Sequence, residues 1–142
     1  MPYGPDGVPS IDYSHTYAIE VSPQKDVKIS FQLLMNGAWE FMNWICIYEL
    51  GAGDKLVAQR TAGVGWGEWN SDVNTRLKTV TYILSCWHRF DSRPIQNRWL
   101  QSTGKILLQT SDEVIYGFDR PGGTGSFDDV VATVKVGQSI LG

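Results

Sequence analysis

Hydrophobic and polar residues alternate along much of the chain, with the two-residue period of a β-strand that buries one face. Residues 26–34 show the pattern most clearly, because apolar side chains from Val27 to Leu33 alternate with polar ones. No segment shows the sustained period of an amphipathic helix. The pattern therefore predicts strands over residues 16–21, 26–34, 38–50, 54–60, 77–88, 104–109, 113–118 and 129–136.

These short, evenly spaced strands predict an all-β protein, an antiparallel β-sandwich of about eight strands with jelly-roll or Greek-key-like connections. Strand 38–50 is apolar on both faces, so we expect it to be central in its sheet or to lie at an interface. Symmetric association would cover such a face, so we also expect a small homo-oligomer. Residues 1–14 are expected to form an extended N-terminal arm, and residues 15–142 a single domain.

The composition excludes several classes of protein. The chain has 142 residues, a hydrophobic fraction of 42% and a net charge of −3, which fits a folded domain rather than a disordered segment. A nucleic-acid binder normally carries a basic surface, so we exclude nucleic acid as a partner. No uncharged apolar run reaches the roughly 18 residues of a membrane helix, and no N-terminal secretory signal is visible. We therefore expect no membrane span and a location that is cytoplasmic, or outside the cell by a route that needs no such signal.

The two cysteines, Cys46 and Cys86, are too few for a disulfide scaffold or a cysteine-only metal site. Cysteine is among the most buried residue types even when it is unpaired, so we expect two buried free thiols. The alternative is one disulfide between two strands.

The most specific signal lies in residues 115–136, where an acidic, glycine-rich stretch leads directly into the last alternating strand. This segment resembles the calcium loop of bacterial β-sandwich lectins of the fucose- and mannose-binding type, and of related bacterial calcium-loop domains. The positions that match the pattern of these lectins are Phe127, Asp129, Val130 and Val131, with Asp119 at the first acidic position and Asp128 where asparagine is usual.

The resemblance implies a β-sandwich in which the carboxylates of Asp119, Asp128 and Asp129 bind calcium, and in which the calcium binds sugar hydroxyls. Calcium takes roughly six to eight oxygen ligands, and carboxylates set its affinity. Some acidic positions of the pattern are replaced here, the second acid by Arg120 and two aspartates by Thr124 and Ser126. The alternative is a structural turn whose aspartates cap backbone N–H groups.

A second candidate site lies in the connection 61–75, which we expect to be a long loop. A sugar site needs an aromatic platform for the C–H faces of the ligand, and planar polar groups for its hydroxyls. The connection supplies this mixture with Trp66, Glu68, Trp69, Asn70 and Asp72. The alternative is that one or both tryptophans fold back over the edge of the core.

The connection 87–103 is also expected to be a loop, and it is the third candidate. Its possible ligand-binding residues are Trp87, His88, Arg89, Asp91 and Trp99. Arginines are suited to the carboxylate or sulfate group of an acidic sugar. The alternative is a solvated loop with internal Arg–Asp pairs and arginine stacked on tryptophan.

Signatures of catalysis are weak in this sequence. Neither His15 nor His88 stands in a metal-ligand spacing, and no nucleophile-elbow motif is present. We therefore predict a non-catalytic, lectin-like protein that binds glycans, with calcium as the cofactor that the resemblance implies. One alternative is a self-assembling or protein-interaction β-sandwich with no small ligand. A second is a small polysaccharide hydrolase that uses a pair of carboxylates.

Overall fold

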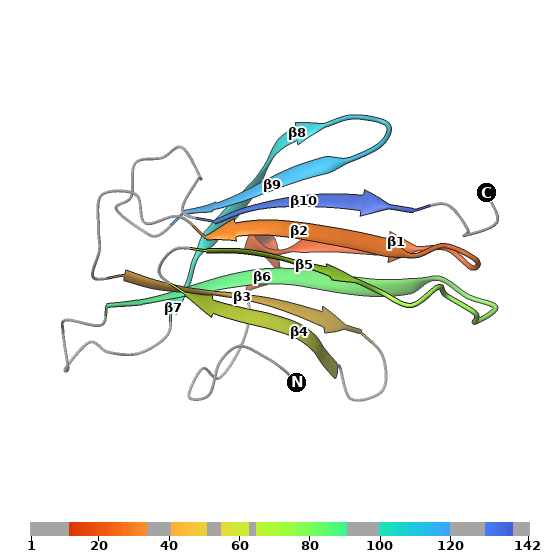
Figure 1. Cartoon of the computed structure of the whole chain (residues 1–142), viewed down its shortest axis with the longest axis horizontal. Coiled ribbons are helices and arrows are strands. Elements are labelled where there is room, and N and C mark those ends of the chain that lie inside the picture. Colours follow the sequence, from red (N-terminus) through yellow and green to blue (C-terminus); the bar gives the residue numbers. More distant parts are fainter. Residues whose placement is uncertain are drawn as a thin grey trace.

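The computed structural model describes residues 12–33, 41–50, 55–62, 65–90, 100–119 and 130–137 (Figure 1). Within them the chain forms two five-stranded sheets in which every strand pair is antiparallel. The first sheet has the order β1 (Tyr17–Val21), β6 (Val80–Phe90), β3 (Phe41–Glu49) and β4 (Lys55–Ala62), with β7 (Leu100–Gln101) paired to β6. The second sheet has the order β5 (Gly65–Asn70), β2 (Val27–Leu33), β10 (Val130–Val136), β9 (Val114–Asp119) and β8 (Thr103–Gln109). A short 3-10 helix, Tyr13–His15, precedes β1.

The two sheets pack face to face, which confirms the prediction of an all-β sandwich. The core between them is built from the inward positions of the alternating strands, and it includes Ile29, Ile45, Leu84, Phe118 and Val130. The strand register brings these inward positions onto one face of each sheet, since directly opposed residues of paired strands point to the same face. Val130, for example, lies opposite Phe118 on β9, and both side chains are fully buried.

Strand β3 is central in the first sheet, between β6 and β4, which confirms that its two apolar faces mark an interior strand. Its inner face joins the main core, whereas Cys46 and Tyr48 form a second buried cluster with Trp87 of β6. Cys86 lies in the main core. The two cysteines therefore occupy opposite faces of the sheet, and both are buried and free, as expected.

All eight predicted strands are present, but the structure adds β5 and β7. The expectation that the whole of 61–75 is a loop is wrong, because β4 continues to Ala62 and Gly65–Asn70 pairs with β2 along its full length. The glycines of this segment hid its strand character, since no alternation of apolar and polar residues marks it. The loop expected at 87–103 is also shorter, because β6 pairs with β3 as far as Phe90.

Consecutive strands change sheet at five places, between β1 and β2, β2 and β3, β4 and β5, β5 and β6, and β7 and β8. The β1–β2 and β5–β6 connections then lie side by side at one end of the sandwich (Figure 1). Hydrogen bonds join their backbones: Gln24 N–H donates to Asn74 O at 2.8 Å, and Asn74 N–H donates to Lys25 O at 2.7 Å. Over the described part of the chain, no helix has the length and apolarity needed to span a membrane.

Candidate functional site

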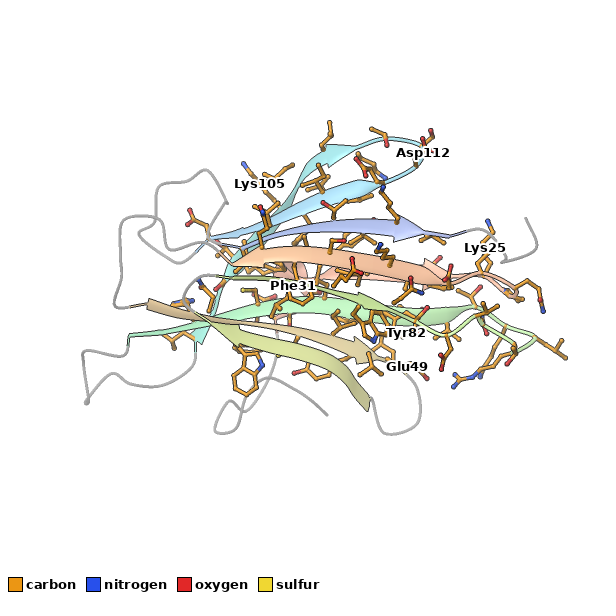
Figure 2. The ribbon with its side chains drawn as sticks, viewed as in Figure 1. Lys25, Phe31, Glu49, Tyr82, Lys105 and Asp112 are labelled. Carbon is orange, nitrogen blue, oxygen red and sulfur yellow. The ribbon has the colours of Figure 1, made fainter. Side chains whose placement is uncertain are left out.

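A pocket of about 430 Å³ lies at this end of the sandwich, where the segment after β5 passes the ends of β3 and β6. Val57 of β4 and Trp69 of β5 both line it, so the pocket lies between the edge strands of the two sheets. Figure 2 shows Glu49 and Tyr82 at this end of the first sheet. The lining residues with functional groups include Glu49, Trp69, Asp72, Asn74, Arg76 and Tyr82.

Two aromatic side chains, Trp69 and Tyr82, contribute to the apolar part of the pocket together with three valines. Trp69 lies opposite the core residue Ile29 in the β2–β5 register, so its indole points inward and is half-buried. It meets the ring of Tyr82 edge to face, with ring centroids 5.2 Å apart and an interplanar angle of 68°. Tyr82 itself is buried. The indole is therefore held in one position while part of it still reaches the pocket.

The polar part of the pocket comes from both sheets. Arg76 Nη2 donates to Glu49 Oε2 at 3.0 Å, across 27 residues of sequence. Burial raises the pKa of Tyr82, the charge of Glu49 raises it further, and a hydrogen bond with Ser71 acts in the opposite direction. The Tyr82 hydroxyl therefore stays protonated at neutral pH. Asp72 is exposed at the same pocket.

Asn74 fixes the wall of the pocket, and its side chain is buried. Its Nδ2 donates to the carbonyl oxygens of Val21 and Lys78, each at 2.9 Å. Its Oδ1 accepts from the Arg76 backbone N–H at 3.0 Å. Because all these partners are backbone groups, the amide holds the path of the segment that carries Asp72 and Arg76.

The structure divides the five residues predicted from connection 61–75. Trp69, Asn70 and Asp72 line the pocket. Glu68 does not, because alternation along β5 turns it to the outer face of the second sheet, where its Oε2 lies 3.4 Å from Lys28 Nζ. Trp66 pairs with Gln32 in the β2–β5 register, and its side chain lies outside the described part of the structure.

Asn70 also takes part in the local scaffold. Its Nδ2 donates to Asp26 Oδ2 and to Ser71 O, each at 2.8 Å. Ser71 is buried and exchanges two hydrogen bonds with Val27, donating its N–H and accepting at Oγ. These bonds attach the end of β5 to the start of β2, so this side of the pocket is preformed.

The third predicted site is not an exposed loop around Trp87 and His88. Both residues lie within β6 and are buried, with 1% and 2% of their surface exposed. Trp87 Nε1 donates to Ser85 Oγ at 3.1 Å, and His88 Nδ1 lies 2.9 Å from Ser102 Oγ. Both side chains therefore lie inside the protein, and not on the exposed loop that the sequence predicts. Of the other members, Arg89 has no described side chain, and Asp91 and Trp99 lie outside the described residues.

The predicted calcium ligands are only partly described. Asp119 is the last residue of β9 and is buried, and its backbone oxygen accepts from Thr103 Oγ1 at 3.0 Å. Asp128 and Asp129 lie outside the described residues. Within the described ranges, no three acidic, histidine or cysteine side chains form a group that could hold a metal ion. Calcium binding at this loop stays a prediction.

Sequence reasoning did not place Glu49, Arg76 or Tyr82 in a sugar site, and it considered Glu49 only among the carboxylates of a possible hydrolase. Tyr82 stands in a strand with clear alternation, which identifies it as a core residue and says nothing of a pocket. Glu49 and Arg76 meet only because β3 and the segment after β5 end at the same place. Comparisons of this chain with protein-family models, with curated proteins and with solved structures find no match.

Proposed function

We propose that the protein binds carbohydrate without catalysis, and that the pocket between β4 and β5 is the sugar site. The observation that carries the proposal is the half-buried indole of Trp69 beside planar polar groups in one preformed pocket. A volume of about 430 Å³ falls within the range of roughly 300–1,000 Å³ typical of small-ligand sites.

The chemistry of the lining fits a hydroxylated ligand. The exposed part of the Trp69 ring suits the C–H face of a sugar, while carboxylate oxygens accept hydrogen bonds from its hydroxyls. Asp72 supplies such an acceptor, and the Arg76 guanidinium supplies donors. The Arg76–Glu49 pair keeps both planar groups oriented at the pocket, although its partly exposed position makes it a small contributor to stability.

The test is a glycan-array screen with the full chain, followed by titration of the strongest hit against tryptophan fluorescence. Asp72→Asn removes one charge and keeps the shape, so we expect at least a tenfold loss of affinity, because hydrogen bonds to charged groups contribute about 1.5–3 kcal/mol. Asp112→Asn is the matched control, since Asp112 lies at the β8–β9 turn, away from the pocket (Figure 2). No array hit, or equal loss in both variants, would overturn the assignment of the site.

Two further arms of this experiment address calcium and hydrolysis. Repeating the screen with EDTA tests the predicted calcium loop: binding that disappears would place the ligand there instead of in the pocket. Release of reducing sugar from the bound glycan would replace the lectin proposal with the hydrolase alternative. In that case the same carboxylates, Glu49 and Asp72, are the first to substitute.

A second candidate function, self-assembly, is favoured by β8. This strand is the edge of the second sheet, and its consecutive residues Ile106, Leu107 and Leu108 are 44%, 40% and 50% exposed. Edge strands usually carry charges or β-bulges that block pairing with another chain. β8 has Lys105 just before this run and a register irregularity between Ile106 and Leu108, but the three consecutive apolar residues carry no charge of their own. We propose that a second copy of the chain pairs here, antiparallel, through β8.

Light scattering over a hundredfold range of protein concentration tests this assembly. Leu107→Lys places a charge in the centre of the edge, so we expect it to yield monomer at concentrations where the unsubstituted chain is a dimer. Gln109→Lys, at the end of the same strand, is the control for added charge. A monomer at every concentration for the unsubstituted chain would remove the candidate.

A further inference from the structure

Two lysines face each other on the outer side of the second sheet. Lys28 of β2 and Lys135 of β10 are direct register partners, and so are Ser30 and Thr133, the next pair on the same face. Directly opposed residues of an antiparallel pair have Cβ atoms about 4.5–5.5 Å apart, and like charges at that spacing destabilise a sheet.

These four residues enclose a hollow of their own. The hollow has a volume of about 210 Å³, and it is lined by Lys28, Ser30, Thr133 and Lys135. A second hollow of about 240 Å³ adjoins it, sharing Ser30 and Thr133 and continuing towards Gln32 and Val131. Small hydroxyl side chains therefore form the floor, and the lysines stand at one end of a trough that follows β2 and β10.

Among the described residues, each lysine has one weak ion-pair partner, on the flank away from the other lysine. Lys28 Nζ lies 3.4 Å from Glu68 Oε2 on the β5 side, and Lys135 Nζ lies 3.6 Å from Glu113 Oε2 on the β9 side. The lysine side chains are 49% and 59% exposed, so both pairs are solvated and each contributes at most about 1 kcal/mol. Both ammonium groups can therefore turn back to the hollow at little cost.

We propose that this hollow is a binding site for a tetrahedral oxyanion, a sulfate or phosphate group. Two lysines and two hydroxyl side chains line the hollow from four register positions. With the ammonium groups turned inward, the four side chains offer donors to several oxygens of one anion. The anion also relieves the repulsion between the two lysines. The adjoining trough offers room for the rest of a ligand that carries the group. This site lies on the outer face of the second sheet, so it does not depend on the proposed sugar pocket.

The experiment is a titration of the isotope-labelled chain with sodium sulfate, followed through backbone amide signals at constant ionic strength. We expect saturable shifts of the amide signals, centred on Lys28, Ser30, Thr133 and Lys135. The general exclusion of sulfate from a protein surface would instead give shifts that neither saturate nor concentrate at one place. The variant Lys28→Gln/Lys135→Gln should raise the dissociation constant at least tenfold. Lys25→Gln/Lys78→Gln removes the same charge from exposed positions outside the hollow and should leave the constant unchanged.

A second variant, Ser30→Ala/Thr133→Val, keeps both charges and removes the hydroxyls, and we expect a smaller loss of about threefold. Equal loss in the two lysine variants, or shifts that never saturate, would overturn the proposal.

Titration with a sulfated disaccharide and its unsulfated counterpart identifies the source of the anion. Tighter binding of the sulfated sugar than of free sulfate supports a group carried on a larger ligand, and equal binding supports the free ion. Binding of the unsulfated sugar with the same shifts would overturn the proposal.

Discussion

The indole of Trp69 and the ring of Tyr82 meet edge to face, 5.2 Å between centroids, although the two residues belong to different sheets. This contact lies where edge strand β5 approaches the first sheet, and it forms the floor of the candidate sugar pocket. One pair of rings thus contributes both to the packing between the sheets and to the shape of the site.

We expect a measurable coupling between these two rings. Trp69→Leu and Tyr82→Leu each lose packing, but the double variant should lose less than the sum, by about 0.5–1.5 kcal/mol, the value typical of aromatic pairs. Urea unfolding of the four proteins of the cycle measures this coupling. Tyr82→Phe keeps the ring and removes only the hydroxyl, so the cycle of Tyr82→Phe with Trp69→Leu should show almost no coupling. Strict additivity in the Leu cycle would contradict the role given to the contact.

The same pair shows how far the sequence predicts the fold. β2 and β10 were predictable because their inward positions are apolar and their outward positions are polar, the pattern that burial of one face demands. β5 carries no such pattern, since glycine stands at its inward positions Gly65 and Gly67, and its pairing with β2 comes from backbone bonds and register. The alternation of apolar and polar residues within a segment therefore does not predict a strand such as β5, which is stabilised by its pairing with the neighbouring strand.

The site was predictable in part for a related reason. Trp69 and Asp72 are close in sequence and chemically unusual, so they were identified without a structure. Glu49 and Arg76 become neighbours only through the topology of the two sheets. The sequence predicts His88 in the loop 87–103, whereas the structure buries it on β6 beside the Ser102 hydroxyl. The burial of a polar residue that has a hydrogen-bond partner cannot be predicted from composition, because the partner is brought beside it only by the fold.

Asn74→Ala should destabilise the protein strongly. The substitution removes three hydrogen bonds and leaves the carbonyls of Val21 and Lys78 without their amide donor. We expect a loss of about 2–4 kcal/mol in the free energy of unfolding, since unsatisfied buried groups cost more than the bonds contribute. Chemical denaturation measures the loss. Thr75→Ala, at the exposed neighbouring position, should change stability by less than about 0.5 kcal/mol. Similar losses in both variants would contradict the anchoring role of the amide.

Two glycines should respond differently to alanine. A Cβ at Gly104 of β8 would lie 2.5 Å from Tyr116 Cε2 and 3.0 Å from Phe118 Cδ1, both on rings of the core. We expect Gly104→Ala to cost about 1–3 kcal/mol, because packed rings move only with their neighbours. A Cβ at Gly137 would meet Oδ1 of the Asp26 carboxylate, the far end of a flexible side chain whose Oδ2 accepts from Asn70. Gly137→Ala should therefore cost less, and thermal unfolding of the two variants compares them. The reverse order would show that the β8–β9 pair adjusts more easily than its packing implies.

The free energy of unfolding should fall at alkaline pH, because burial raises the pKa of the Cys46 thiol from 9.0 to about 12. The folded state holds this proton more tightly than the unfolded chain, so the thiol's contribution is complete below pH 9 and is lost as the pH rises towards 12. Burial also raises the pKa of Tyr48, whose proximity to Cys46 adds to the shift, so both groups act in the same direction. Urea unfolding midpoints between pH 8 and pH 11 measure the loss. Cys46→Ala removes the thiol and its effect on Tyr48, so the unfolding midpoint of this variant should fall less steeply over this range.

A thiol-specific reagent should leave Cys46 unmodified in the native protein at pH 8 and label it on unfolding. Equal slopes in the two proteins, or rapid native labelling of Cys46, would show that the thiol is not enclosed as the second buried cluster requires.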